Sequence, residues 1–482
     1  MREDNDQSDL SQTDLLDRAD PTTEPQMNPD GTTEGDYELS RRDVASILYT
    51  VDTGDQQQLW TLLDPLHPAD IADLLEQLNA YDRRRVVQLY GREFDGDILS
   101  ELDEGLREEI ISVLQPEVLV EAVRDLETDD VVDLVEDLDE PQQEVILDAL
   151  EDADRVAVEQ ALSYPDGSAG RLMQREVVAA PEHWTVGNAI DFLRKSRDLP
   201  EQFYHIILVD PRMHPKGNVT LGKLMSSRRD VPLTDLVEEV FEVIPVTQDE
   251  ADVAYAFNQY HLISAPVVDE NDRLVGVITI DDAMIVLDEE HEEDILRLAG
   301  VADEASLSDS IWDAAKGRAV WLGVNLMTAI LASLVIDMFS GTIDQMVALA
   351  VLMPIVASMG GNAGTQTMTV TVRALATRDL TAQNAMRVML REVSVGVLNG
   401  ALFGAIMAGV AVLWFGVPML ALVIGLAMLG THVAAALGGI VIPMALDRAN
   451  IDPALASGPF VTTVTDVVGF LAFLGLAAKV LL

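Results

Sequence analysis

Five long apolar segments in the C-terminal third of the chain constrain its fold more than any other feature. Each is long enough to cross the hydrocarbon of a bilayer as a helix, which takes ~20 residues. A single segment in hydrocarbon can satisfy all its backbone hydrogen bonds only as a helix. The sequence therefore predicts a five-helix transmembrane domain over residues 316–482 that lies in the lipid bilayer. Its spans are expected at 319–339, 345–372, 393–415, 419–446 and 454–482.

The basic residues predict how these spans are oriented. Lys316 and Arg318 precede the first span, four arginines lie between the second and third, and Arg448 lies between the fourth and fifth. The other two loops contain no basic residue. Because positive residues favour the cytoplasmic side, we expect a multi-pass protein of the cell membrane with its N-terminal region in the cytoplasm. The C-terminus is then outside, with Lys479 as a minor exception.

The acidic residues lie mostly upstream of the spans. The whole chain has a formal net charge of −51. Residues 316–482 contain 8 Lys or Arg and 7 Asp or Glu, which leaves 23 basic and 75 acidic residues in 1–315. Such a charge repels itself unless salt screens it. Two explanations remain open, a halophilic acidic protein in a salt-rich host and an acidic surface that binds metal. Only 5 of the 31 basic residues are Lys, which favours the first.

The composition also excludes several functions. A nucleic-acid partner is not expected, because phosphate binding needs a basic patch. The chain has no Cys and therefore no disulfide or thiolate metal site. Its N-terminus lacks the basic and apolar regions of a signal peptide, so we expect insertion through the internal spans. No nucleophile–base set or Cys/His metal cluster is present, and we expect no enzymatic activity.

Changes in residue pattern divide the region before the spans. Residues 1–37 are polar and acidic and predict a disordered tail. Residues 38–165 repeat acidic amphipathic phrases at roughly 20–25-residue intervals, which predicts an all-α domain of stacked helical hairpins. Residues 166–234 and 235–287 each predict an α/β unit in the order helix, strand, strand, helix. Residues 288–315 form an acidic amphipathic connector to the first span.

The second α/β unit contains a candidate nucleotide site. The phrase "GVITIDD" joins a strand to the start of a helix and includes Thr279 and Asp282. Thr and Asp at a helix start are ordinary caps, but they could also hold the phosphate and ribose of a nucleotide. The first unit has Lys223 where the second has Asp282. If only one unit binds a nucleotide, the second is the better candidate.

Asp466 is the most informative single residue, because it lies in the fifth span. An ionised carboxylate facing lipid costs about 2.5–3.5 kcal/mol at the centre of a span, so it needs a wet cavity, a cation or a partner. Thr462, Thr463 and Thr465 surround it with hydroxyls, and Gly458–Pro459 allows a kink that exposes carbonyl groups. These are hard oxygen ligands suited to Mg²⁺ or Ca²⁺. The alternative is a hydrogen bond from Asp466 to a polar group such as His432.

The second span carries polar and small residues that are unusual in lipid. Gly360, Gly361 and Asn362 lie in "PIVASMGGNAGTQT", where we expect the helix to break, since irregular backbone at this depth lines water or is buried in protein. The alternative is close helix packing through small residues. Asp452, before the fifth span, would concentrate cations at a pore mouth or is simply a solvated loop acid.

Three phrases carry a resemblance to a known family. "YPDGSAGRLM" (164–173), "GGNAGTQ" and "DPALASGPFVTTVTD" resemble the MgtE family of magnesium channels, and the α/β units resemble a pair of CBS domains. The resemblance implies an N domain, a CBS pair, a plug helix in the connector and a five-helix pore. It also implies a homodimer with its pore between the subunits and Asp466 from each. The permeant ion would be a largely hydrated Mg²⁺, assisted by carbonyls near Thr462 and in the glycine stretch.

The resemblance further implies a gate. Mg²⁺ bound between the helical domain, the CBS pair and the connector would close the pore when cytoplasmic Mg²⁺ is high. The positions that match the family's sensing acids are Asp281, Glu289, Glu292 and Glu293, whereas Met284 stands where an acid is expected. "GVITIDD" is similar to the nucleotide-contacting stretch of CBS domains, which implies ATP as a ligand of the second unit.

Two other functions remain open. A secondary transporter that couples divalent ions to protons or Na⁺ would use the same acid and the same spans. A membrane-anchored CBS nucleotide sensor would use the spans only as an anchor. An anchor has no need of Asp466 or of a polar second span, so a cation path explains these residues better.

Overall fold

The computed structural model describes residues 39, 41–124, 126–136, 138, 140–196, 199–200, 202–301 and 311–481. The predicted tail at 1–37 and residues 302–310 of the connector lie outside the described residues. The chain forms two compact units. The first contains residues 1–250 and 262–279, and the second contains residues 251–261 and 280–482.

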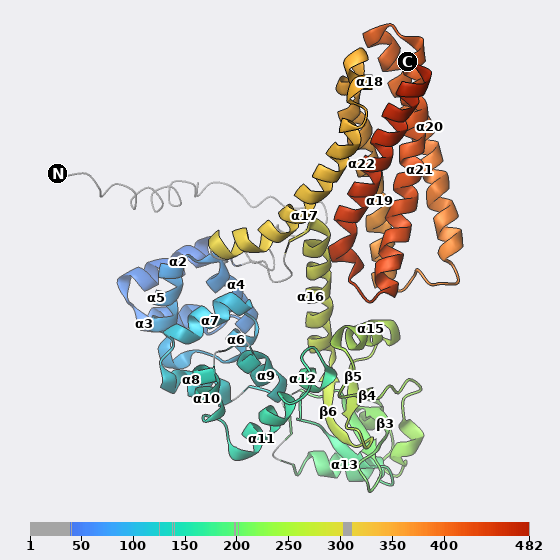
Figure 1. Ribbon diagram of the computed structural model, residues 1–482. Coiled ribbons are helices and arrows are strands. Elements are labelled where there is room, and N and C mark those ends of the chain that lie inside the picture. The colour runs from blue at the N-terminus through green and yellow to red at the C-terminus, as the bar shows by residue number, and fades with distance from the viewer. Residues whose placement is uncertain are drawn as a thin grey trace, which may run out of the picture. The chain divides into compact units, whose positions relative to one another are not determined.

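The first unit begins with a domain of short helices (Figure 1). They are α2 (Arg41–Thr53), α3 (Gln56–Leu63), α4 (Pro68–Gln77), α5 (Ala80–Tyr90), the 3₁₀ helix η1 (Gly91–Glu93), α6 (Asp97–Ser100), α7 (Glu104–Val113), α8 (Pro116–Arg124), α9 (Thr128–Glu136), α10 (Glu140–Leu147) and α11 (Asp152–Ala161). Their Leu, Ile and Val side chains form one continuous core, and most of the acids are exposed outside it. The predicted all-α fold of this region is confirmed.

Caps and one buried arginine explain where these helices begin and how they meet. The Asn79 side chain accepts hydrogen bonds from the backbone N–H groups of Tyr81 and Asp82, which starts α5. Arg83 is 7% exposed and donates to the carbonyls of Leu75 and Leu78 that end α4. It also pairs with a glutamate of α7 at 2.8 Å. A buried guanidinium with all these partners orients three helices at once.

Asp130 makes this domain sensitive to pH. Burial raises the pKa of its carboxyl to about 6, and the acidic neighbours add to the shift. The folded chain therefore holds this proton more tightly than the unfolded chain, and the resulting stabilisation is present below about pH 4 and lost as pH rises through about 6. We expect Asp130→Asn to stabilise the fold by about 1 kcal/mol at pH 7.5, allowing for partial exposure, and to change little at pH 4.

Urea unfolding followed by tryptophan fluorescence at both pH values measures this difference. Glu117→Gln, which neutralises an exposed acid of α8, is the matched control and should leave the pH dependence unchanged. Equal stability of wild type and Asp130→Asn at pH 7.5 would contradict the prediction.

Arg171, in the phrase "SAGRLM", connects the helical domain with the sheets that follow. It lies in α12 (Ala169–Leu172), donates to the carbonyl of Tyr164 at 3.0 Å, and forms ion pairs with Glu136 of α9 and with Asp166. Burial raises the pKa of Glu136, and the charge of Arg171 opposes that shift. Gly170 packs so closely that an added Cβ would lie 2.5 Å from the Tyr164 ring. The phrase is therefore a structural junction.

Two three-stranded sheets follow, one for each predicted α/β unit (Figure 1). In the first, β1 (Ala179–Pro181) is parallel to β2 (His205–Val209), which is antiparallel to β3 (Pro215–Thr220). In the second, β4 (Ile244–Pro245) is parallel to β5 (Ser264–Val268), which is antiparallel to β6 (Leu274–Thr279). The helical pieces between them are α13 (Val186–Leu193), α14 (Leu221–Ser226), η2 (Leu233–Leu236) and α15 (Glu250–Tyr260). Each unit contains the two successive strands that were predicted, but β1 and β4 were not predicted.

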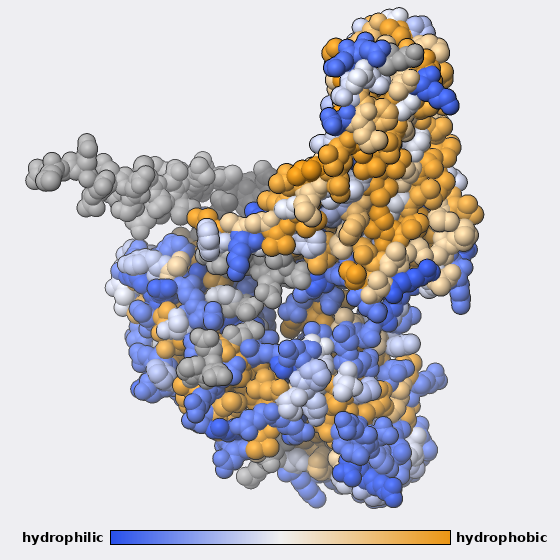
Figure 2. All heavy atoms as spheres, viewed as in Figure 1, coloured by the Kyte–Doolittle hydropathy of each residue, from blue (hydrophilic) through white to orange (hydrophobic). Residues whose placement is uncertain are grey.

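The second unit contains the spans. Its helices are α16 (Ile280–Ala299), α17 (Ile311–Asp337), α18 (Ser340–Gln345), α19 (Ala348–Ala376), α20 (Ala385–Phe415), α21 (Pro418–Arg448) and α22 (Pro453–Val480). Among the described residues five helices are long and apolar enough to cross a membrane, which confirms the predicted number. Figure 2 shows hydrophobic residues covering their outer surface. Residues 288–299 of the predicted connector are the second half of α16, which begins at Ile280, and its last residues begin α17.

The expected break in the second span is wrong. α19 is one continuous helix, with Pro354 inside it. Its glycines serve close packing, because a Cβ on Gly360 would lie 2.4 Å from the Thr431 methyl, and one on Gly364 would lie 2.8 Å from Val461. Gly361 has open space on its side, with nothing within 4 Å. Small residues let helices approach closely, so neighbouring helices stabilise a stretch that would bend in isolation.

Candidate functional site: an acid in the fifth span

Asp466 lies in the middle of α22 and is partly exposed. Thr462, one helical turn earlier, is exposed on the same side of the helix, since residues four apart share a face. The Thr462 hydroxyl donates to the carbonyl of Gly458 at 3.0 Å, and the Thr463 hydroxyl donates to the carbonyl of Pro459 at 2.6 Å. These donations use the hydroxyl protons and leave oxygen lone pairs, so α22 presents a carboxylate and hydroxyl acceptors.

Thr465 has a different environment from the other threonines. It is fully buried, its hydroxyl donates to the carbonyl of Thr462 at 2.9 Å, and its methyl lies 3.1 Å from the Cβ position of Gly364. It therefore packs α22 against α19. Thr462 and Asp466 lie on the exposed side of α22.

The second span contributes a polar stripe that was only partly predicted. Asn362 and Gln366 are exposed on α19 and are four residues apart. Ser358, Thr365 and Thr369 are also exposed and continue the same face at helical spacing. Ser358 and Thr369 were missed, although their spacing from Asn362 is visible in the sequence. The stripe is an unusual amount of polarity for the surface of a spanning helix.

His432 does not satisfy Asp466. It is 2% exposed in α21, its Nδ1 lies 2.8 Å from the carbonyl of Met428, and its ring stacks on Phe403. Within the described residues no hydrogen bond or ion pair joins it to Asp466. The alternative explanation for Asp466 therefore has no support in the structure.

Asp452 lies at the start of α22, where α16 meets it. One carboxylate oxygen accepts from the N–H of Ala454 at 2.7 Å and thus caps the helix. The other lies 3.2 Å from Nη1 of Arg297, whose Nη2 pairs with Glu293 at 2.7 Å. Leu298, the next residue on α16, packs against a cluster of Met368, Val372, Ala454 and Val461. The end of α16 is therefore attached to the end of the fifth span by charge and by apolar contact.

Arg297 and Asp294 were not predicted from the sequence. Burial raises the pKa of Asp294, and the charge of Asp452 raises it further. A second acid so close to Asp452 means that the negative potential at this end of α22 is strong and that Arg297 only partly offsets it. The sequence gives little indication of the role of Arg297, because one basic residue among many acids on an amphipathic helix looks like a member of an ordinary surface ion pair.

The four predicted sensing acids lie along α16 and are not gathered together. Asp281, Glu289 and Glu292 are exposed, and Glu293 forms an ion pair with Arg297. Met284 is exposed on the same helix. No group of three acidic, His or Cys side chains with metal-site geometry occurs in the described part of the chain. The sensor assignment remains a prediction.

The two sheets border a narrow, mostly closed cleft. His205 of β2 and Ser264 of β5 meet across it, with 2.6 Å between Nδ1 and Oγ. Burial lowers the pKa of His205, which favours the neutral form of the ring, while the charge of Glu238 opposes this shift. Thr279 is 6% exposed and lines the same cleft, together with Gln174, Glu176, Val177, Val178, Gln202, Phe203, Tyr204, Ile207 and Val277. Asp282 is in the first turn of α16 and is not among the lining residues.

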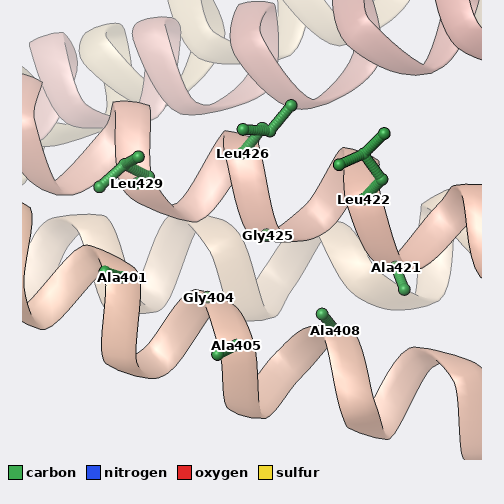
Figure 3. A pocket seen from close by; sticks show the side chains of 9 residues that line it. All are labelled: Ala401, Gly404, Ala405, Ala408, Ala421, Leu422, Gly425, Leu426 and Leu429. Carbon is green, nitrogen blue, oxygen red and sulfur yellow. The ribbon is translucent and has the colours of Figure 1, made fainter.

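A groove of about 420 Å³ between α20 and α21 does not belong to the cation site. Figure 3 shows that alanine, glycine and leucine side chains line it. Such a lining has no oxygen ligand for a hard cation. The groove is a consequence of the close approach of the two helices at Gly404, where an added Cβ would lie 2.8 Å from the carbonyl of Gly425.

Five spans, an acid inside one of them and a CBS-like pair of sheets define a multi-pass membrane protein for cation transport. The profile of MgtE, a divalent cation transporter, matches residues 353–476. The MgtE intracellular N domain matches residues 66–167, and the CBS domain matches 229–289. The chain is 32% identical over 445 residues to the magnesium transporter MgtE of Thermus thermophilus, covering 98% of that protein, and 27% identical over 434 residues to that of Bacillus subtilis. This chain belongs to the MgtE family of magnesium transporters.

One solved structure is similar to part of this chain. The cytosolic domain of the Mg²⁺ channel MgtE in complex with ATP is 29% identical and corresponds to 50% of this chain and 99% of that one, with a TM-score of 0.47. The family assignment confirms magnesium transport, the CBS domain, the membrane location and the cytosolic N-terminal domain that we predicted.

Proposed function

We propose that this protein is a Mg²⁺-selective channel for magnesium uptake and that Mg²⁺ on the cytosolic side closes it. The observation that supports a cation path most strongly is Asp466, a partly exposed acid in the middle of a span with an exposed hydroxyl one turn away. Mg²⁺ gives up its water reluctantly, so it is bound through few carboxylates and retained water molecules. One carboxylate with hydroxyls and the Asn362 side chain suits such a hydrated ion.

The path requires a second copy of the chain. A single Asp466 on an exposed helix face can contact an ion from one side only. The first span supports pairing, because few residues of α17 are buried within one copy. We propose a homodimer in which each subunit contributes Asp466, Thr462 and the polar stripe of α19. The alternating basic loops support the placement of the C-terminus outside.

The end of α16 supplies the gate in this proposal. Arg297 bonds to Asp452 and thereby attaches α16 to the cytoplasmic end of the span that carries Asp466. A divalent ion among the acids of α16 would favour this attached arrangement, because it removes the repulsion between them. In this proposal the attached arrangement is the closed form, in which the guanidinium of Arg297 lies at the pore mouth.

Arg297→Ala tests the gate. Removing the guanidinium leaves Asp294 and Asp452 to repel each other, so we expect about threefold to tenfold more internal Mg²⁺ to be needed for closure. Flux into liposomes at graded internal Mg²⁺ measures the midpoint. Arg297→Lys keeps the charge and should shift it less. A midpoint equal to that of wild type for Arg297→Ala would contradict this role.

The cleft between the sheets is the proposed nucleotide site. Its apolar and aromatic lining suits the flat face of a base, and Thr279, His205 and Gln202 provide groups that hydrogen-bond to a base or ribose. We propose ATP as the ligand, with its adenosine at this cleft, which must widen to admit it because its free volume is only about 20 Å³.

Reconstituted protein decides between the channel and its alternatives. A channel carries Mg²⁺ current without a proton or Na⁺ gradient, whereas a coupled transporter needs the gradient and shows no measurable conductance. A nucleotide sensor with an inert anchor would move no Mg²⁺ under either condition. Single-channel recording with Mg²⁺ as the only cation, repeated at several cytosolic Mg²⁺ concentrations, measures both conduction and closure.

A further inference from the structure

Arg378 lies in the short loop between α19 and α20 and makes two contacts with one face of α15. Its guanidinium forms an ion pair with Asp252, and its Cζ lies 4.1 Å from the centre of the Tyr255 ring. Asp252 and Tyr255 are three residues apart on a helix and therefore share a face. All three residues belong to the same compact unit.

The loop that presents Arg378 is well ordered by its own hydrogen bonds. Arg378 has a φ of +56°, which is uncommon for a residue with a side chain. Its N–H donates to the carbonyl of Leu375, and the N–H of Leu380 donates to that of Ala374 at 2.7 Å. Asn384 also donates to the carbonyl of Asp379 at 2.7 Å. These bonds fix the loop to the ends of α19 and α20, so the direction of the Arg378 side chain is defined.

The two partners in this contact belong to different parts of the chain. α15 lies in sequence between β4 and β5 of the second CBS sheet, with connections of a few residues. Arg378 comes two residues after the end of α19, the continuous helix that carries Asn362 and Gln366. A force on Arg378 is therefore transmitted directly to α19, the helix that carries the polar stripe.

We propose that Asp252 and Tyr255 form a docking face for the loop at residues 377–379, and that this contact stabilises the closed pore. The proposal rests on the proposed function, of which it names one mechanical step. It assigns the contact to the closed form because the same unit holds α16 against Asp452. A guanidinium suits the position, since its plane stacks on a ring while its N–H groups reach a carboxylate.

The first test uses cross-linking and does not depend on transport. The chain has no Cys, so Ala256→Cys with Thr377→Cys gives a clean pair beside the contact. In liposomes we expect a flexible bis-maleimide to join these positions faster at high Mg²⁺ than without it. Adding Arg378→Glu should slow the reaction at least threefold. Equal rates with and without Arg378→Glu would overturn the docking contact.

The second test measures the gate. Arg378→Glu and Asp252→Arg should each raise the internal Mg²⁺ concentration needed for closure about threefold to tenfold. The effect is of this size because an exposed ion pair and a cation–π contact each contribute only a modest free energy. The double variant should return towards wild type, and Tyr255→Phe should be milder than Tyr255→Ala. Arg228→Glu is the control, because Arg228 is an exposed residue whose guanidinium pairs with Asp230, two residues away, at 3.0 Å.

The two tests separate the two proposals. If wild-type protein shows no Mg²⁺-dependent closure but the cross-linking rate still depends on Arg378, the gating function fails and the contact stands. If closure is normal and the midpoint of Arg378→Glu equals that of Arg228→Glu, the docking face has no role in gating and this inference is wrong.

Discussion

Asp466→Asn is expected to reduce Mg²⁺ flux at least about a hundredfold while the protein still inserts and dimerises. The carboxylate is the only acid inside the described part of the fifth span, and Asn keeps its size while removing its charge. At about 6 Å and an effective dielectric of about 40, a single negative charge attracts Mg²⁺ by about 3 kcal/mol. Since 1.36 kcal/mol is a factor of ten, each lost carboxylate costs about two decades in occupancy.

Flux into liposomes, with insertion and oligomeric state checked by size exclusion, measures this effect. Asp344→Asn is the matched control, because Asp344 is an exposed acid of α18 outside the spans. It should leave flux within about twofold of wild type, as is usual for exposed acids. Mg²⁺-selective flux at the wild-type rate in Asp466→Asn would refute the assignment of the pore.

Gly439→Ala is expected to give the largest loss of stability of any methyl addition in the bundle. A Cβ at Gly439 of α21 would lie 2.8 Å from Thr367 Cβ, 2.9 Å from the carbonyl oxygen of Gly364 and 2.9 Å from the N of Met368. Two of these atoms are backbone, so a rotamer change cannot relieve the overlap and the helices must separate. Overpacking of this kind costs about 1–3 kcal/mol and, here, also moves α19.

Thermal unfolding in detergent measures the loss, and Gly430→Ala on the same helix is its control. Nothing lies within 4 Å of a Cβ at Gly430. Ala is a better helix former than Gly by up to about 1 kcal/mol, so this variant should unfold at the same or a higher temperature than wild type. If both variants unfold at the same temperature, the close packing of α19 on α21 is not what stabilises the bundle.

Much of the architecture could be predicted because its causes are local. Span length, the period of the acidic helices and the strands at 205–209, 264–268 and 274–279 depend on nearby residues, and all were predicted. The short strands β1 and β4 were missed because two or three residues carry no periodicity; they exist only because β2 and β5 offer an edge to pair with.

The candidate site shows the same division between what nearby residues determine and what the packing of distant segments decides. The sequence by itself determined that an acid lies in the fifth span, that hydroxyls surround it and that the second span is too polar for lipid. Only the tertiary structure decided which of those residues are packed and which are open. Thr465 and Gly360 lie inside the bundle, whereas Thr462 and Gly361 lie on open faces one to three residues away.

The reason is geometric. Successive residues of a helix point about 100° apart, so neighbours in the sequence face different surroundings, and only the positions of the other helices determine which face is covered. The same holds for Arg297 and Arg378. Each is an ordinary basic residue in the sequence, and each acquires its partners from a helix far away in the chain. The sequence therefore determined the acid in the membrane, and the packing of the helices decided what surrounds it.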